Sequence, residues 1–157
     1  MIGKLTDTEI EELLGGQLVG RLGCHHDGKT YVVPISYAYD GQYIYSLSFE
    51  GLKLDIMRKN PKICFQVDSM KDMANWQSVI VWGEFEELKD ADSRKNGLSI
   101  LVNRSLPLIS SVTTHLNPTW PFVEKDLNKI KGIAYRILVT EKSGRFENTR
   151  KWSEFSS

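Results

Sequence analysis

The sequence predicts a mainly β protein, an antiparallel barrel of about six strands with two or three helices packed outside it. Three observations support this fold class. Apolar residues alternate with a period of two in six short segments, and the pairs Asp27-Gly28 and Asp40-Gly41 place tight hairpin turns between the first three segments. The early glycines precede a strand and do not form G-x-G-x-x-G, so the alternating strands and helices of a nucleotide-binding fold are not expected.

The chain begins with a capping box. The Thr6 hydroxyl can accept a hydrogen bond from the Glu9 N–H while Glu9 reaches back to Thr6, and Ile10 and Leu14 then share one helical face. We expect this helix to end at the glycines 15–16. The six strands are expected at residues 17–24, 30–39, 43–48, 62–68, 76–88 and 132–141.

Two residues interrupt the strand pattern. Pro34 cannot donate a ladder hydrogen bond, so we expect its strand at a sheet edge or a bulge, and we expect Gly83 to bend the strand that contains it. Helices are expected at 52–59 and 90–102, and the three prolines of segment 103–126 leave that segment unassigned. The whole chain, 1–157, is expected to form one domain, with a helical or loop insertion at about 90–131 and a polar C-terminal tail at about 147–157.

Composition excludes several classes of partner. Twenty Lys plus Arg residues balance twenty Asp plus Glu residues, so no broad field would attract nucleic acid or a membrane, and an anionic ligand must be held locally. Cys24 and Cys64 form no C-x-x-C pair and are expected in the core. His25 and His26 point to opposite faces of a strand, which favours a polar hairpin tip over a metal site. Without a signal-peptide pattern or a long apolar run, a cytoplasmic protein is expected.

The segment from Ser46 to Lys53 carries the strongest chemical signal. Hydroxyl groups, Gly51 and a lysine meet where a strand leads into a helix, and a helix N-terminus exposes N–H groups and partial positive charge that favour a phosphate. Lys53 would add a full charge and Ser48 a hydroxyl, which together suit a terminal phosphomonoester. The alternative is a solvated lysine in the first turn of a helix.

Five short motifs follow one another in a specific order. They are VVPISY at 32–37, DGQYIYS at 40–46, GLK at 51–53, NPKI at 60–63 and WQSVIVWG at 76–83, and a closing strand follows at 133–146. Together they resemble the pyridoxamine 5'-phosphate oxidase-like flavoproteins. The resemblance is closest to the branch of nitroimidazole-resistance and general-stress-type proteins.

The resemblance implies a six-stranded antiparallel split β-barrel that forms a homodimer and binds flavin mononucleotide (FMN) in a groove between the subunits. It places Lys53 on the flavin phosphate, the strand 33–36 beside the isoalloxazine ring, the backbone of Ser46 and Leu47 against that ring, and Ser78 at a polar contact. The full set of implied cofactor-binding residues is Val33, Pro34, Ile35, Ser36, Ser46, Leu47, Ser48, Gly51, Leu52, Lys53, Gln77 and Ser78.

The chain also departs from the family pattern. Leu52 stands where an arginine is common, and Tyr31 and Ser36 stand where the true oxidase has basic residues. Phosphate binding would then depend on Lys53, with Arg58 or a group of the partner chain as a further cation. Because the oxidase's C-terminal tryptophan and arginine signature is not recognisable, we expect an activity other than vitamin B6 oxidation.

Four residues outside these motifs have two interpretations each. Trp120 could stack on a flavin or a flat substrate, or anchor a long loop. His115 could line a substrate pocket or be an ordinary loop residue. Arg136 and Arg145 could meet the phosphate or the partner chain, although surface ion pairs are their more ordinary role.

Two functional hypotheses follow from the sequence. The first is an FMN-dependent oxidoreductase that acts on a small flat substrate; no catalytic residue is predicted, because the redox chemistry belongs to the flavin. The second is a non-catalytic protein that holds FMN, haem or another planar cofactor for storage or stress response, since the same barrel serves several ligands. No metal-ligating residue is predicted.

Overall fold

The structure, a computed structural model, describes residues 1–104 and 126–149. The strands of this part form one antiparallel sheet in the order β3-β2-β6-β7-β8-β5-β4, and β1 pairs with β8. The strands are β1 (Ile2–Lys4), β2 (Val19–His26), β3 (Lys29–Ser36), β4 (Ala38–Tyr39), β5 (Tyr43–Ser48), β6 (Lys62–Asp72), β7 (Asn75–Glu87) and β8 (Ile133–Glu147). The helices are α1 (Asp7–Gly16), α2 (Leu52–Lys59), α3 (Ala91–Val102) and the short 3₁₀ helix η2 (Leu127–Lys129).

Tyr37 closes this sheet into a barrel. Strands β3 and β4 stand at the two ends of the sheet order, yet Tyr37 alone separates them in the chain. Near this junction the Ser46 hydroxyl of β5 donates to the Ser36 carbonyl of β3 at 2.8 Å. The buried Tyr37 ring packs edge-on against Phe65 with 4.9 Å between ring centres, and its hydroxyl donates to the Leu14 carbonyl at 2.6 Å. The predicted mainly β, split-barrel fold class is therefore confirmed.

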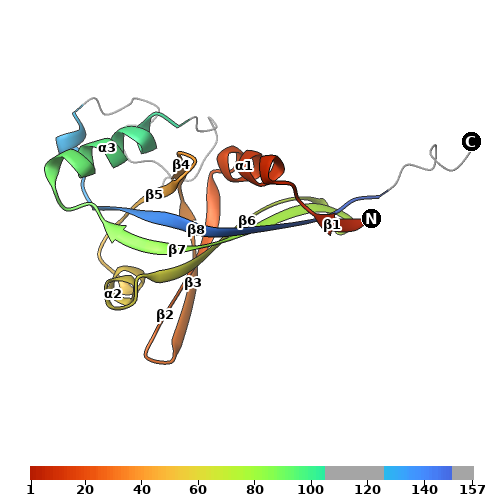
Figure 1. Ribbon diagram of the computed structural model, residues 1–157. Coiled ribbons are helices and arrows are strands. Elements are labelled where there is room, and N and C mark those ends of the chain that lie inside the picture. The colour runs from red at the N-terminus through yellow and green to blue at the C-terminus, as the bar shows by residue number, and fades with distance from the viewer. Residues whose placement is uncertain (105–125, 150–157) are drawn as a thin grey trace, which may run out of the picture.

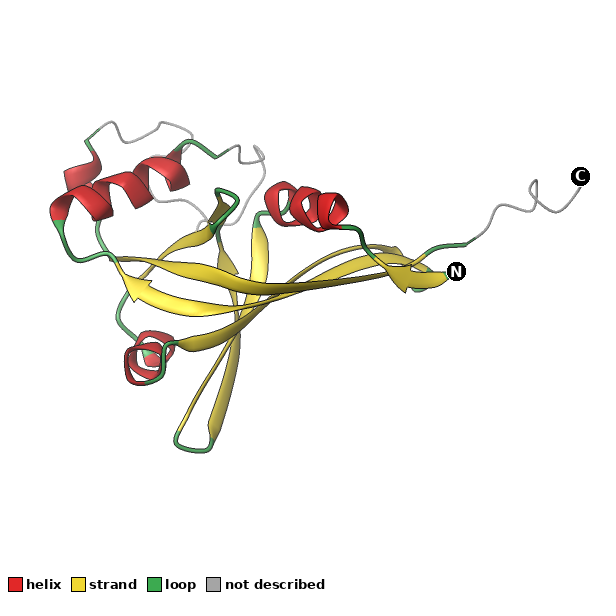
Figure 2. Cartoon of the chain, viewed as in Figure 1, coloured by secondary structure: helices red, strands yellow, loops and turns green. Residues whose placement is uncertain are grey.

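The helices lie at the periphery of the twisted sheet (Figure 2). Figure 1 shows α1 and α3 on one side of the sheet and α2 on the other. Helix α1 buries Ile10, Leu13 and Leu14 in the main core, while α3 buries Leu98 and Leu101 in a second cluster against β5 and β8. None of the described helices is long and apolar enough to cross a membrane.

Several local predictions are confirmed. The capping box forms, because the Thr6 N–H donates to Glu9 Oε1 at 2.9 Å and the Glu9 N–H donates to Thr6 Oγ1 at 3.2 Å. Asp27 and Gly28 have φ angles of 51° and 75°, which are the left-handed values of a tight hairpin turn between β2 and β3. Pro34 lies on β3, an edge strand of the sheet order that pairs only with β2.

The strand bounds require correction. The predicted strand 30–39 is two strands, since the chain crosses between sheet edges at Tyr37. Strands β6 and β8 extend beyond 62–68 and 132–141 because their exposed polar ends pair with β7. Strand β1, which was not predicted, pairs with the distant strand β8. A register shift between Trp82 and Gly83 marks a β-bulge at the position where the bend was expected.

The cysteine prediction is only half correct. Cys24 is buried in the main core, as expected, with an exposed fraction of 3%. Cys64 is half-buried on the outer face of the sheet, because it is one residue out of phase with the core residues Ile63 and Phe65.

Candidate functional site

The N-terminus of α2 is an uncapped helix end. Helices α1 and α3 have side-chain caps from Thr6 and Asp90, whereas Gly51 at the N-cap of α2 supplies none. The first N–H groups of a helix have no intrahelical acceptor, so those of α2 remain available to an anion. The Ser48 hydroxyl, three residues before Gly51, donates to the Phe49 carbonyl at 3.0 Å.

Lys53 lies in the first turn of this helix and is half-buried. Helix α2 packs against β2, which brings Lys53 close enough to Cys24 for the two side chains to interact electrostatically. Burial lowers the pKa of the Lys53 ammonium below its usual 10.5, and the neighbouring Cys24 partly offsets this effect. Within the described part of the chain, Lys53 forms no ion pair. The fold therefore partly buries a cation without giving it a carboxylate partner.

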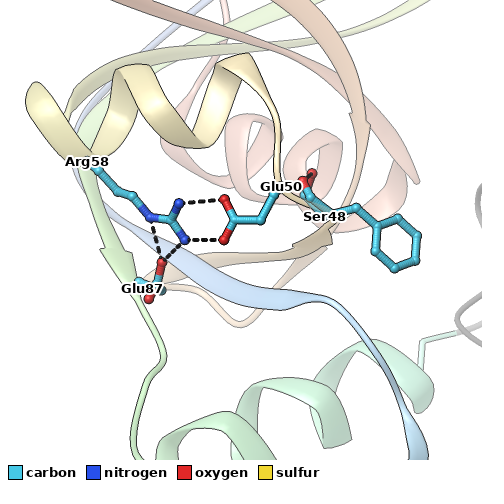
Figure 3. A network of polar contacts seen from close by, with 5 residues as sticks. Ser48, Glu50, Arg58 and Glu87 are labelled. Carbon is cyan, nitrogen blue, oxygen red and sulfur yellow. Dashed lines mark hydrogen bonds and ion pairs between the residues drawn. The ribbon is translucent and has the colours of Figure 1, made fainter.

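Arg58, the second predicted cation of the site, is committed to two carboxylates (Figure 3). Its Nη1 and Nη2 donate to Glu50 at 2.6 and 2.8 Å, and its Nε and Nη2 donate to Glu87 Oε1 at 2.9 and 2.6 Å. These contacts raise the pKa of the Arg58 guanidinium and lower that of the Glu50 carboxyl. Arg58 thus joins the loop before α2 to the end of β7.

The predicted ring-contacting residues alternate between the core and the surface. Ile35 is buried in the core and Val33 packs against it, whereas Pro34 is exposed on the outer face. The Ser36 hydroxyl is buried and has no hydrogen-bond partner among the described residues. The Ser46 hydroxyl is committed to the Ser36 carbonyl, so a side-chain contact of Ser46 with a ligand is not available in this geometry.

Strands β3 and β5 and helix α2 nevertheless converge. Strand β5 leads through residues 49–51 directly into α2, and the bond between Ser46 and Ser36 joins β5 to β3. Leu47 and Ser48 at the end of β5 are half-buried, and Leu52 is 42% exposed. The part of the predicted set at 33–36, 46–48 and 51–53 therefore lies in one region of the molecule.

Gln77 and Ser78 lie elsewhere. Ser78 is opposite Asp68 and Arg145 in the sheet and accepts a hydrogen bond from Gln66 at 3.0 Å. Glu87, which contacts α2 through Arg58, follows Ser78 by nine positions on the same strand, a path of about 30 Å along an extended strand. Figure 1 shows β7 running from the neighbourhood of α2 toward β1. Gln77 and Ser78 are thus separated from the Lys53 region of the same chain.

Of the remaining candidates, two lie on the surface of β8 and two lie outside the described residues. Arg136 donates to Glu86 at 2.9 Å and lies 4.0 Å above the Tyr43 ring centre, as expected for a surface ion pair. Arg145 is exposed on β8. Trp120 and His115 lie outside the described residues.

The sequence interpretation missed an outer-face groove of about 480 Å³. It is lined in part by Val32, Cys64 and Trp82, which face outward from β3, β6 and β7. The sequence could have revealed this groove. Residues next to Val32, Cys64 and Trp82 in the chain pack in or against the core, so strict alternation predicts that these three side chains face outward. A cavity of about 600 Å³ between the ends of α1 and α3 contains none of the predicted cofactor-binding residues.

Comparison with known proteins places these features in a family. The sequence pattern described as pyridoxamine 5'-phosphate oxidase matches residues 6–146. An uncharacterised protein of Rhizobium meliloti (strain 1021) is 41% identical over 70 residues, which are 45% of this chain and 46% of that protein. The matched region therefore spans about half the length of this curated relative.

Solved structures show the same fold. An FAD-binding protein of Mesorhizobium loti is 32% identical, with a TM-score of 0.72 over 94% of this chain and 99% of that chain. A Bacteroides thetaiotaomicron protein described as a candidate 5-nitroimidazole antibiotic resistance protein is 16% identical, with a TM-score of 0.70 over 93% of this chain and 87% of its own, a likeness of fold alone. Since the family pattern covers most of the sequence, the chain belongs to the pyridoxamine 5'-phosphate oxidase family.

Proposed function

We propose that this chain binds FMN, with the phosphate at the N-terminus of α2 and the ring along β3. The observation that carries the proposal is Lys53, a half-buried ammonium without an ion-pair partner among the described residues, at a helix end without a side-chain cap. Burying an unpaired charge is costly, and an anionic ligand would offset that cost. The FAD-binding relative from Mesorhizobium loti supports a flavin as the ligand.

The residues present suit a flavin phosphate. The first N–H groups of α2 and the Lys53 ammonium would bind the phosphate. The Ser48 hydroxyl, at the end of β5, would supply a further donor only by giving up its bond to the Phe49 carbonyl. Pro34 offers an exposed apolar edge, and the buried Ser36 hydroxyl retains an unused donor. When bound, the flavin supplies reversible hydride transfer, while the protein supplies position and local charge.

A second copy of the chain completes the proposed site. Gln77 and Ser78 lie too far along β7 to join Lys53 within one chain, so a homodimer would let the partner provide them. The outer sheet face supports such an interface, because Val32, Ile80 and Trp82 are 61%, 37% and 39% exposed there. Burying these side chains between two copies would remove apolar surface from water.

We further propose an oxidoreductase that reduces or oxidises a small flat substrate. An isoalloxazine ring held against an apolar strand leaves its other face for a flat molecule to stack on. The two free cysteines, Cys24 and Cys64, are compatible with work in the reducing cytoplasm.

The absorption spectrum of the freshly purified protein tests the ligand. Flavin bands, and a rise in melting temperature on adding FMN, are expected. A colourless protein whose melting temperature does not respond to FMN or FAD refutes flavin binding, and a Soret band identifies haem instead. Anaerobic addition of a nicotinamide nucleotide, followed by an acceptor, then separates a redox enzyme from a protein that only stores the flavin.

A further inference from the structure

Glu50 occupies a position from which it could obstruct the proposed phosphate site. It directly precedes Gly51, the N-cap of α2, and stands three positions before Lys53. A carboxylate next to a helix N-terminus is a good acceptor for the free N–H groups and is stabilised by the helix dipole. The same carboxylate could also pair with the ammonium of Lys53. Glu50 therefore has the charge and the location of an internal competitor for a phosphate.

The structure shows Glu50 engaged elsewhere. Both oxygens of Glu50 accept hydrogen bonds from Arg58, at 2.6 and 2.8 Å. The Glu50 side chain is 60% exposed, so packing alone does not fix it in this position. Arg58 belongs to the last turn of α2. It also donates two hydrogen bonds to Glu87 at the end of β7 (Figure 3). Glu87 is only 16% exposed, so it holds the guanidinium in a fixed place.

We propose that Arg58 is a positioning residue that holds the Glu50 carboxylate away from the N-terminus of α2 and so keeps the phosphate site open. This inference rests on the proposed binding of a flavin phosphate. It assigns Arg58 a role through Glu50 and not as a direct phosphate ligand. Four donor–acceptor contacts already engage its Nε, Nη1 and Nη2 atoms.

The physical consequence follows from tethering. A carboxylate attached to the adjacent residue competes with a free ligand at an effective concentration of about millimolar or more, as short flexible tethers provide. Releasing Glu50 from Arg58 should therefore raise the dissociation constant of a phosphate-bearing flavin. It should not change the dissociation constant of riboflavin, because riboflavin has no phosphate with which the Glu50 carboxylate could compete.

The test compares FMN with riboflavin by flavin fluorescence. Arg58→Met is made in a Glu87→Gln background, because the mostly buried Glu87 carboxylate would otherwise be left without its cation. Relative to Glu87→Gln alone, the FMN dissociation constant should rise about tenfold, as for one charge-assisted contact, and riboflavin affinity should stay constant. Adding Glu50→Gln should restore FMN affinity to within about twofold of the Glu87→Gln protein. Arg136→Met, which breaks the neighbouring ion pair with Glu86, is the matched control and should leave both affinities unchanged.

Each other outcome overturns the proposal. If Arg58 binds the phosphate directly, affinity stays low after Glu50→Gln is added, and Glu50→Gln alone tightens FMN binding. If Arg58 only stabilises the fold, riboflavin and FMN affinities fall together with the melting temperature. A wild-type protein that binds neither flavin refutes the proposed function itself, a result that differs from all of these.

Discussion

Replacing Lys53 by methionine should weaken FMN binding and stabilise the ligand-free protein. A charge-assisted hydrogen bond contributes about 1.5–3 kcal/mol, and each 1.4 kcal/mol is a factor of ten in affinity, so the loss is about 10- to 150-fold. Methionine keeps the length and the apolar stem of the side chain, which isolates the ammonium as the group removed. Riboflavin, which has no phosphate, should lose little affinity.

The opposite effect on stability follows from the burial of the ammonium. Folding lowers the pKa of Lys53, which means that the charged form is less favoured in the folded chain than in the unfolded one. The penalty is full at a pH below the lowered pKa and is relieved as the pH rises from that pKa to the ordinary value of 10.5. Removing the charge should therefore raise the free energy of unfolding of the ligand-free protein wherever Lys53 is protonated in the folded chain.

The assay combines flavin fluorescence titration with thermal unfolding of the ligand-free protein. Lys59→Met is the control, because Lys59 is exposed at the other end of the same helix and should change neither quantity appreciably. An FMN affinity that changes by less than about threefold, together with a lower melting temperature, would refute the assignment of Lys53 to the phosphate.

Three further predictions concern pH, packing and capping. FMN affinity should fall on the alkaline side at a pH below 10.5, because Lys53 loses its proton earlier than an ordinary lysine, and Lys53→Arg should remove this fall; a flat profile up to pH 10.5 contradicts this. Gly83→Ala should lower the free energy of unfolding, measured in urea, by about 1–3 kcal/mol, because a Cβ there would lie 2.4 Å from the Leu138 carbonyl oxygen. The control Gly15→Ala should not destabilise the protein, because a Cβ at Gly15 meets nothing within 4 Å. Thr6→Ala should cost about 1 kcal/mol by breaking the capping box, and an unchanged urea midpoint would show that the box is dispensable.

Features set by neighbouring residues could be predicted from the sequence. The capping box at Thr6, the turn at Asp27-Gly28 and helix α2 each depend on a few consecutive side chains and backbone angles, and the structure has them where they were expected. Pro34 on an edge strand follows from its missing N–H. Local chemistry was sufficient in these cases because no distant partner decides the outcome.

Features set by distant partners could not be predicted. The run 30–39 shows no break in its pattern at Tyr37, yet the chain changes sheet edge there because the buried ring and its hydroxyl bond to Leu14 fix that residue outside the ladder. Arg58 resembled a free cation in the sequence, but Glu87, which lies 29 positions away, commits it elsewhere. Neither contact has a signature in local spacing.

The positions of the charged residues determine what the zero net charge implies for an anionic ligand. Arg58, Arg136 and Lys142 each pair with a carboxylate of their own chain, so these three cations are neutralised locally. In the proposed site a phosphate would meet no general positive field, and its affinity would come from the partly buried Lys53 and the N-terminus of α2 at close range. In such a site one misplaced carboxylate would matter as much as one missing cation, which is why we expect the contact between Glu50 and Arg58 to bear directly on binding.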